Sequence, residues 1–142
     1  MNRWNPFGRR LSAAPAAPCL AQATQWDVYI KDGKQAKDQG QYAKALKLYT
    51  LALEEAEKFG PTDPRLATSL NNLALLYATQ ADYAKAEPLY KRSLAIDEKA
   101  LGPDHPSVAT DLNNLALLYA TQGDYAKAVP MLKRSLAIRE KA

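Results

Sequence analysis

The chain has 142 residues, of which 47% are hydrophobic and 24% are charged, and this length suits one domain of modest size. The single cysteine, Cys19, excludes a disulfide framework and a thiolate metal cluster, and we expect neither a metal nor a cofactor. No run reaches the roughly 18 to 20 apolar residues that a bilayer-spanning helix needs, so we expect no membrane span.

The formal net charge of +4 arises almost entirely at the start of the chain. Arg3, Arg9 and Arg10 precede the first acidic residue, Asp27, and the remainder carries 16 basic and 15 acidic side chains. Affinity for phosphates grows with the number of them that a basic face neutralises. The near-neutral body therefore disfavours nucleic acid as a partner.

Residues 1–25 form a segment of distinct composition, because they contain three arginines, several prolines and alanines, and no acid. The basic start, the weakly apolar middle and the small residues Ala21 and Ala23 follow the layout of a secretory signal with cleavage after Ala23. This predicts export to the periplasm or the exterior. The alternative is a disordered tail on a cytoplasmic protein.

An internal repeat accounts for the rest of the chain. Residues 67–100 and 109–142 are offset by 42 positions and differ at only six of 34 aligned residues. A fainter copy precedes them, since residues 41–45 match residues 82–86. The sequence thus predicts one repeat domain over residues 26–142, divided into units 26–66, 67–108 and 109–142.

Apolar periodicity predicts two helices in each unit. In the second unit the first helix follows the N-cap Asp63 and the first-turn Pro64, and it buries a stripe at i, i+3, i+4 and i+7. The turn falls at Gln80–Ala81, after which Asp82 caps a second helix that runs to about Leu101. Pro88 and Pro130 lie near the starts of their helices, where we expect a kink and no termination.

The repeated residues carry a family resemblance. The pattern of leucine, small and aromatic positions is met by Leu70, Leu73, Ala74, Tyr77, Ala81, Tyr83, Ala86, Tyr90 and Ser93, and by their counterparts Leu112, Leu115, Ala116, Tyr119, Gly123, Tyr125, Ala128, Leu132 and Ser135. This pattern resembles the tetratricopeptide repeat. The 42-residue period and the phrase from Leu101 to Ala109 are similar to the longer variant of kinesin light chains.

The resemblance implies an all-α fold, a right-handed α-solenoid of three helix-turn-helix hairpins whose first helices line a concave groove. The first unit departs from the pattern at Asp32 and Ala36, where leucine and tyrosine are expected, and is interpreted as a cap.

The side of each first helix opposite the buried stripe is rich in amides and hydroxyls, with leucines between them. Such groups can bind the N–H and C=O groups of an extended peptide whatever its side chains. The predicted groove residues are Thr68, Asn71, Asn72, Leu75, Thr79, Thr110, Asn113, Asn114, Leu117 and Thr121, joined by Lys31 and Lys34 of the first unit, whose charge favours an acidic guest segment.

These observations predict a non-enzymatic scaffold that binds a peptide or partner protein in the groove. No catalytic residue is predicted, because His105 lies in a loop at a capping position without a nucleophile or orienting carboxylate beside it. The alternative is a self-assembling repeat module that forms homo-oligomers through an uncovered apolar strip on its last helix, with Leu132, Leu136 and Ile138 as the contact residues.

Overall fold

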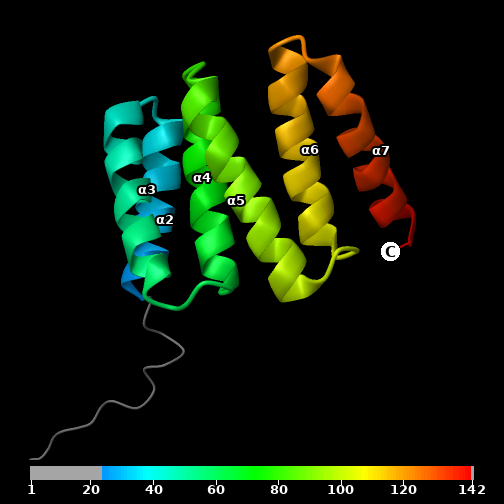
Figure 1. Cartoon of the computed structure of the whole chain (residues 1–142). Coiled ribbons are helices and arrows are strands. Elements are labelled where there is room, and N and C mark those ends of the chain that lie inside the picture. Colours follow the sequence, from blue (N-terminus) through cyan, green and yellow to red (C-terminus); the bar gives the residue numbers. More distant parts are fainter. Residues whose placement is uncertain (1–23, 142) are drawn as a thin grey trace, which may run out of the picture.

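The structure, a computed structural model, describes residues 24–141 as a row of three helical hairpins (Figure 1). The first hairpin consists of α2 (Gln25–Asp38) and α3 (Tyr42–Glu57), the second of α4 (Pro64–Thr79) and α5 (Tyr83–Leu101), and the third of α6 (Pro106–Thr121) and α7 (Tyr125–Lys141). The described residues contain no strand, which confirms the predicted all-α class. The predicted export segment and its cleavage position lie outside the described residues.

Helix starts are fixed by side chains at the predicted positions. The Asp63 carboxylate accepts a hydrogen bond from the Arg65 backbone N–H at 2.9 Å, and Nδ1 of His105 accepts one from the Ser107 N–H at 3.0 Å. At the start of α2, where no cap was predicted, Thr24 and Asp27 form a reciprocal capping box. His105 therefore acts as a cap at the start of α6.

One predicted cap differs in the structure. Asp82 occupies the N-cap position of α5, but its side chain makes no capping hydrogen bond and forms an ion pair with Lys85 at 3.7 Å. Both internal prolines match the expectation of continued helices, because Pro88 and Pro130 lie inside α5 and α7.

The turn inside each hairpin needs a residue in the left-handed region. Gly40 has a φ of 76° and Gly123 has a φ of 80°, and Ala81 adopts a φ of 62° at the equivalent position of the second hairpin. Glycine enters this region without a Cβ clash, whereas alanine is strained there by about 1 kcal/mol. The three turns are therefore the same turn, and the middle one carries backbone strain.

The core runs along the row of hairpins. Small residues such as Ala45, Ala74, Ala86 and Ala116 are fully buried where helices approach closely, and they pack beside large rings such as that of Tyr90. The second helix of each hairpin packs against the first helix of the next one, through α3 with α4 and through α5 with α6. Within the described residues no helix has the length and apolarity that crossing a membrane would require.

Candidate protein-binding surface

The outward side of α4 and α6 carries most of the residues predicted from the repeat. We call this side the first-helix surface. Leu75 and Leu117 are 41% and 64% exposed there, although both are large and apolar. The hydroxyl residues of the set are exposed and the amide residues are half-buried; they are Thr68, Thr79, Thr110 and Thr121, and Asn71, Asn72, Asn113 and Asn114.

A cavity of about 200 Å³ opens on the first-helix surface between α4 and α6. Leu75 and Leu117 flank it, Asn114 contributes an amide to its wall, and Tyr83 and Tyr90 of α5 line it as well. Burial raises the pKa of Tyr90 to about 12, so this ring stays neutral throughout the physiological range. The cavity is thus mainly apolar with a few polar groups, and its size suits one aliphatic or aromatic side chain.

The asparagines of this surface do not form a regular ladder. Nδ2 of Asn114 donates a hydrogen bond to Oδ1 of Asn71 at 3.1 Å, which joins the second hairpin to the third. Nδ2 of Asn72 is buried and has no acceptor among the described residues. One amide pair therefore links adjacent repeats, and Asn72 retains an unsatisfied donor.

The two predicted lysines lie on the first hairpin. Lys31 and Lys34 are exposed on α2 at the positions equivalent to Asn72 and Leu75 of α4. The polar character of this surface therefore changes along the row, from cationic on α2 to amide-rich on α4 and α6.

The predicted self-association residues fall into two groups. Leu132 and Leu136 are 43% and 59% exposed on α7, where Tyr125 and Val129 continue the same face. Ile138 is only 2% exposed, because it packs against the Val108, Ala109 and Leu112 cluster of α6 inside its own hairpin. The prediction that Ile138 belongs to an uncovered strip was wrong.

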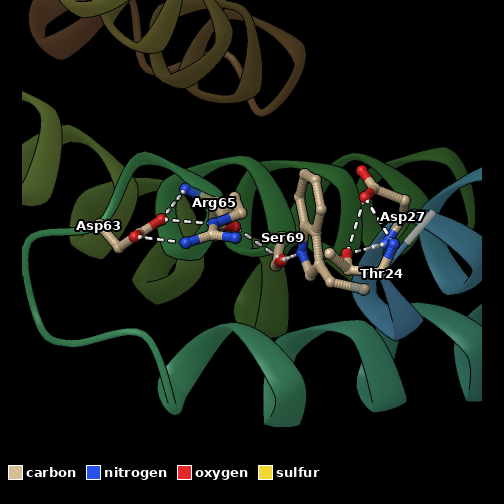
Figure 2. Close-up of polar contacts among 6 residues, drawn as sticks. Thr24, Asp27, Asp63, Arg65 and Ser69 are labelled. Carbon is tan, nitrogen blue, oxygen red and sulfur yellow. Dashed lines mark hydrogen bonds and ion pairs between the residues drawn. The ribbon is translucent and has the colours of Figure 1, made fainter. Parts of the chain in front are cut away.

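Two polar arrangements escaped the sequence-based prediction. Trp26 Nε1 donates a hydrogen bond to Ser69 Oγ at 2.7 Å and so ties α2 to α4. Figure 2 shows Ser69 on α4 in line with Arg65 and Asp63. The side chains of Arg65 and Asp63 form an ion pair at 2.9 Å. Farther along the row, Asp97 and Asp111 are buried carboxyls, 7% and 3% exposed. The sequence signals for the second arrangement were two of the six differences between the nearly identical repeats, Ser69 against Asp111 and Asp97 against Arg139.

The described residues contain no group of three or more histidine, cysteine or acidic side chains arranged to hold a metal ion.

Comparisons with known proteins agree with this architecture. The family model described as tetratricopeptide repeat matches residues 33–99 and 80–141. Photosystem I assembly protein Ycf3 of Parasynechococcus marenigrum (strain WH8102) is 34% identical over 77 residues, which are 54% of this chain and 42% of that protein. The chain thus spans less than half the length of the curated relatives it matches.

Several solved structures share the fold. BtubC (BKLC) from P. vanneervenii superposes with a TM-score of 0.78 at 28% identity, over 86% of this chain and 50% of that one. A putative kinesin light chain of Podosopora anserina with nearly identical TPR-like repeats gives 0.72 at 25% identity, over 80% of this chain and 54% of that one.

Proposed function

Because the chain belongs to the tetratricopeptide repeat family, whose members generally serve as non-catalytic interaction scaffolds, we propose that it binds an extended peptide of a partner protein on its first-helix surface. The 200 Å³ cavity between Leu75 and Leu117 carries this proposal. It offers an apolar pocket for one guest side chain, and the surrounding hydroxyls and amides offer partners for the guest backbone.

The exposure of the two leucines supports a role in binding. Leu75 and Leu117 occupy equivalent positions on the outward side of α4 and α6, and a large part of each apolar side chain stays exposed to water there. A pair of exposed leucines around a cavity matches the usual pattern of an apolar anchor site surrounded by polar groups. Lys31 and Lys34 would lie along the same guest chain and would favour acidic residues in the part that reaches α2.

Replacing Leu117 with glutamine is expected to weaken peptide binding at least tenfold, since it places a polar group where an apolar guest side chain is desolvated. An array of immobilised peptides identifies the tightest-binding sequence, and fluorescence anisotropy then measures its dissociation constant for each variant. The Asn114→Ala variant should weaken the binding of the same peptide, because it removes the amide group of the cavity wall.

The matched control is Leu136→Gln on α7, which makes the same chemical change at an equally apolar exposed position. It should leave the dissociation constant within about twofold. Equal effects of the two leucine substitutions would count against peptide binding on the first-helix surface.

The apolar face of α7 supports a second candidate function, self-association through this helix. Its residues Tyr125, Val129, Leu132 and Leu136 are equivalent to Tyr83, Glu87, Tyr90 and Leu94 of α5, and that side of α5 is covered by α6. The side of α2 equivalent to the side that α4 packs against α3 does not complement this face, because Gln25, Asp32 and Gln35 stand there in place of leucines. We therefore propose that α7 pairs with α7 of a second copy about a twofold axis.

Sedimentation velocity over a range of concentrations tests this pairing. We expect a reversible dimer whose dissociation constant rises at least tenfold in Leu136→Gln, because each substitution alters both sides of a twofold interface. Leu117→Gln, which lies on the first-helix surface, should dimerise like the parent. A strictly monomeric parent at high concentration would exclude the pairing.

A further inference from the structure

A second cavity, of about 170 Å³, lies at the junction between the second and third hairpins. Ala67, Thr68 and Asn71 of α4 contribute to its wall, together with Ser93 and Asp97 of α5 and with Asp111 of α6. It is separate from the cavity between Leu75 and Leu117, but the two are adjacent. Asn71 lines the second cavity and Asn114 lines the first, and a hydrogen bond joins these two amides.

The equivalent place at the first junction is filled by the protein itself. Trp26 is the repeat equivalent of Ala67, and its ring packs against the cluster that contains Ala56 and Leu66. Its Nε1–H is bound by Ser69 Oγ at 2.7 Å. At this junction a large side chain thus supplies both the volume and the hydrogen-bond donor.

The second junction has neither a large side chain that fills the space nor an N–H donor equivalent to that of Trp26. Ala67 replaces the tryptophan, and Asp111 replaces the serine that accepted from it. The alanines of α3 at positions 52 and 56 become Ser93 and Asp97 on α5. A filled apolar junction is thus exchanged for an open one that is lined by two carboxyl groups.

The Asp111 carboxyl has only part of its hydrogen-bonding capacity satisfied. Oδ1 accepts a hydrogen bond from Ser93 Oγ at 3.2 Å, whereas Oδ2 is buried and has no partner among the described residues. Asp111 and Asp97 are 3% and 7% exposed, and no basic side chain of the described residues lines the cavity. An ionised Asp111 buried without a counter-ion is unfavourable, so without a bound cation this carboxyl keeps its proton beside the Asp97 carboxyl. A cation bound in the cavity would stabilise the ionised form of the pair.

We propose that this pocket binds the guanidinium group of an arginine side chain carried by the guest peptide. The inference rests on the proposed function, because Thr68 and Thr110 line the cavity and are exposed on the first-helix surface where the peptide would lie. A guanidinium presents a rigid planar fork of five donors, which suits the free oxygen of Asp111 and the nearby Asp97 carboxyl together. Its donors would replace the indole N–H that Trp26 supplies at the first junction.

This pocket adds a selection rule to the first-helix surface. A guest that places an apolar side chain between Leu75 and Leu117 can place an arginine in the neighbouring cavity, with the Asn71–Asn114 pair between them. Acidic guest residues would instead lie toward Lys31 and Lys34 at the other end of the row.

The test uses a blocked tripeptide, acetyl-Gly-Arg-Gly-amide, and its citrulline counterpart, which has nearly the same shape without the charge. Each is titrated into the whole chain in mildly alkaline buffer and followed by ¹H–¹⁵N NMR. We expect saturable shifts of amide signals at 67–71, 93–97 and 107–111 with the arginine peptide, and at least tenfold weaker binding of the citrulline peptide. Equal affinity for the two peptides would overturn the proposal.

Three variants locate the binding. Asp111→Asn should weaken the arginine peptide at least tenfold, and Ala67→Trp with Asp111→Ser, which rebuilds the first junction at the second, should abolish its binding while the chain stays folded by circular dichroism. The control Asp104→Asn makes the same charge change at an exposed residue that pairs with Lys141, and it should bind like the parent. Retained binding in a folded Asp111→Asn chain would also overturn the proposal.

Calcium chloride replaces the arginine peptide in a parallel titration. Shifts of the same amides by calcium alone, without any by the arginine peptide, would identify a metal site and refute the guanidinium assignment. The proposed function is judged separately by the Leu117→Gln variant and its array-selected peptide. Tripeptide binding without the Leu117 effect would refute the proposed function and leave a cation pocket, and the reverse result would refute only the pocket.

Discussion

Replacing Tyr90 with alanine is expected to lower the free energy of unfolding by about 3 to 5 kcal/mol. The side chain is 3% exposed and packs within the cluster of Ala74, Ala86, Leu115 and Tyr119, which joins the second hairpin to the third. Truncation leaves a cavity at this junction that the surrounding helices can fill only in part. Urea denaturation followed by circular dichroism measures the change.

The repeat supplies a matched control for this substitution. Leu132 is the equivalent residue of the third unit, and it is 43% exposed on α7. Leu132→Ala should cost only about 1 kcal/mol, because 43% of the side chain stays exposed to water in the folded chain. If both substitutions cost the same, the junction is not the main site of burial and the row of hairpins is packed differently.

Stability should fall as the pH rises from about 4 to 8, because of Asp111. Burial, with the neighbouring Asp97 carboxyl as a further cause, raises the pKa of Asp111 from 3.8 to about 8 in the folded chain. Between these two values the folded state holds a proton that the unfolded state has lost. The stabilisation is complete below the lower pKa and is lost as the pH passes the higher one, with a slope of up to about 1.4 kcal/mol per pH unit.

The charged groups that act on Asp111 lie on α5. On α5 these are Asp97 and Glu98, and Glu98 is paired with Arg134 at 2.6 Å. The remaining α4 and α6 side chains that line the cavity are uncharged. Asp63 has a lowered pKa because of its hydrogen bond with Arg65, so its contribution is lost only in more acidic solution.

Urea denaturation of the parent and of Asp111→Asn at a series of pH values measures this effect. The variant should lose most of the slope between pH 4 and 8 and should be more stable than the parent at neutral pH, by about 2 to 4 kcal/mol. Asp104→Asn should keep the slope of the parent. A parent whose stability is flat over this range would contradict a buried, protonated Asp111.

The helices could be predicted well from the sequence because the repeat shows the same pattern of apolar, capping and turn residues more than once. The stop at Leu101, the cap at His105 and the continuation of α5 through Pro88 all follow from local chemistry and were confirmed. Ile138 was misplaced because the second helix of a hairpin has two apolar sides. One faces its own first helix and the other faces the next unit, and periodicity alone does not separate them.

The buried acid cluster was missed for a different reason. The burial of Asp111 depends on which residue stands across the junction, and the sequence does not pair Trp26 with Ser69 or Ala67 with Asp111. The sequence shows that Asp111 replaces Ser69 between two nearly identical repeats. It does not show that Asp111 lies opposite Ala67 across the junction. The predicted groove residues lie together on one side because their helical phase alone decides that.

The order of contacts along the row has a consequence for how the molecule opens. Each helix makes its main contacts with the helix before it and the helix after it, so contact order is low and the chain should fold quickly. Trp26 fills the junction between the first two hairpins, whereas the junction between α5 and α6 holds an open cavity, so local opening is expected to begin by separating the second and third hairpins. An arginine bound between α4, α5 and α6 would hold the second and third hairpins together and slow that first step. Binding in this small pocket would therefore lengthen the lifetime of the whole folded row of hairpins.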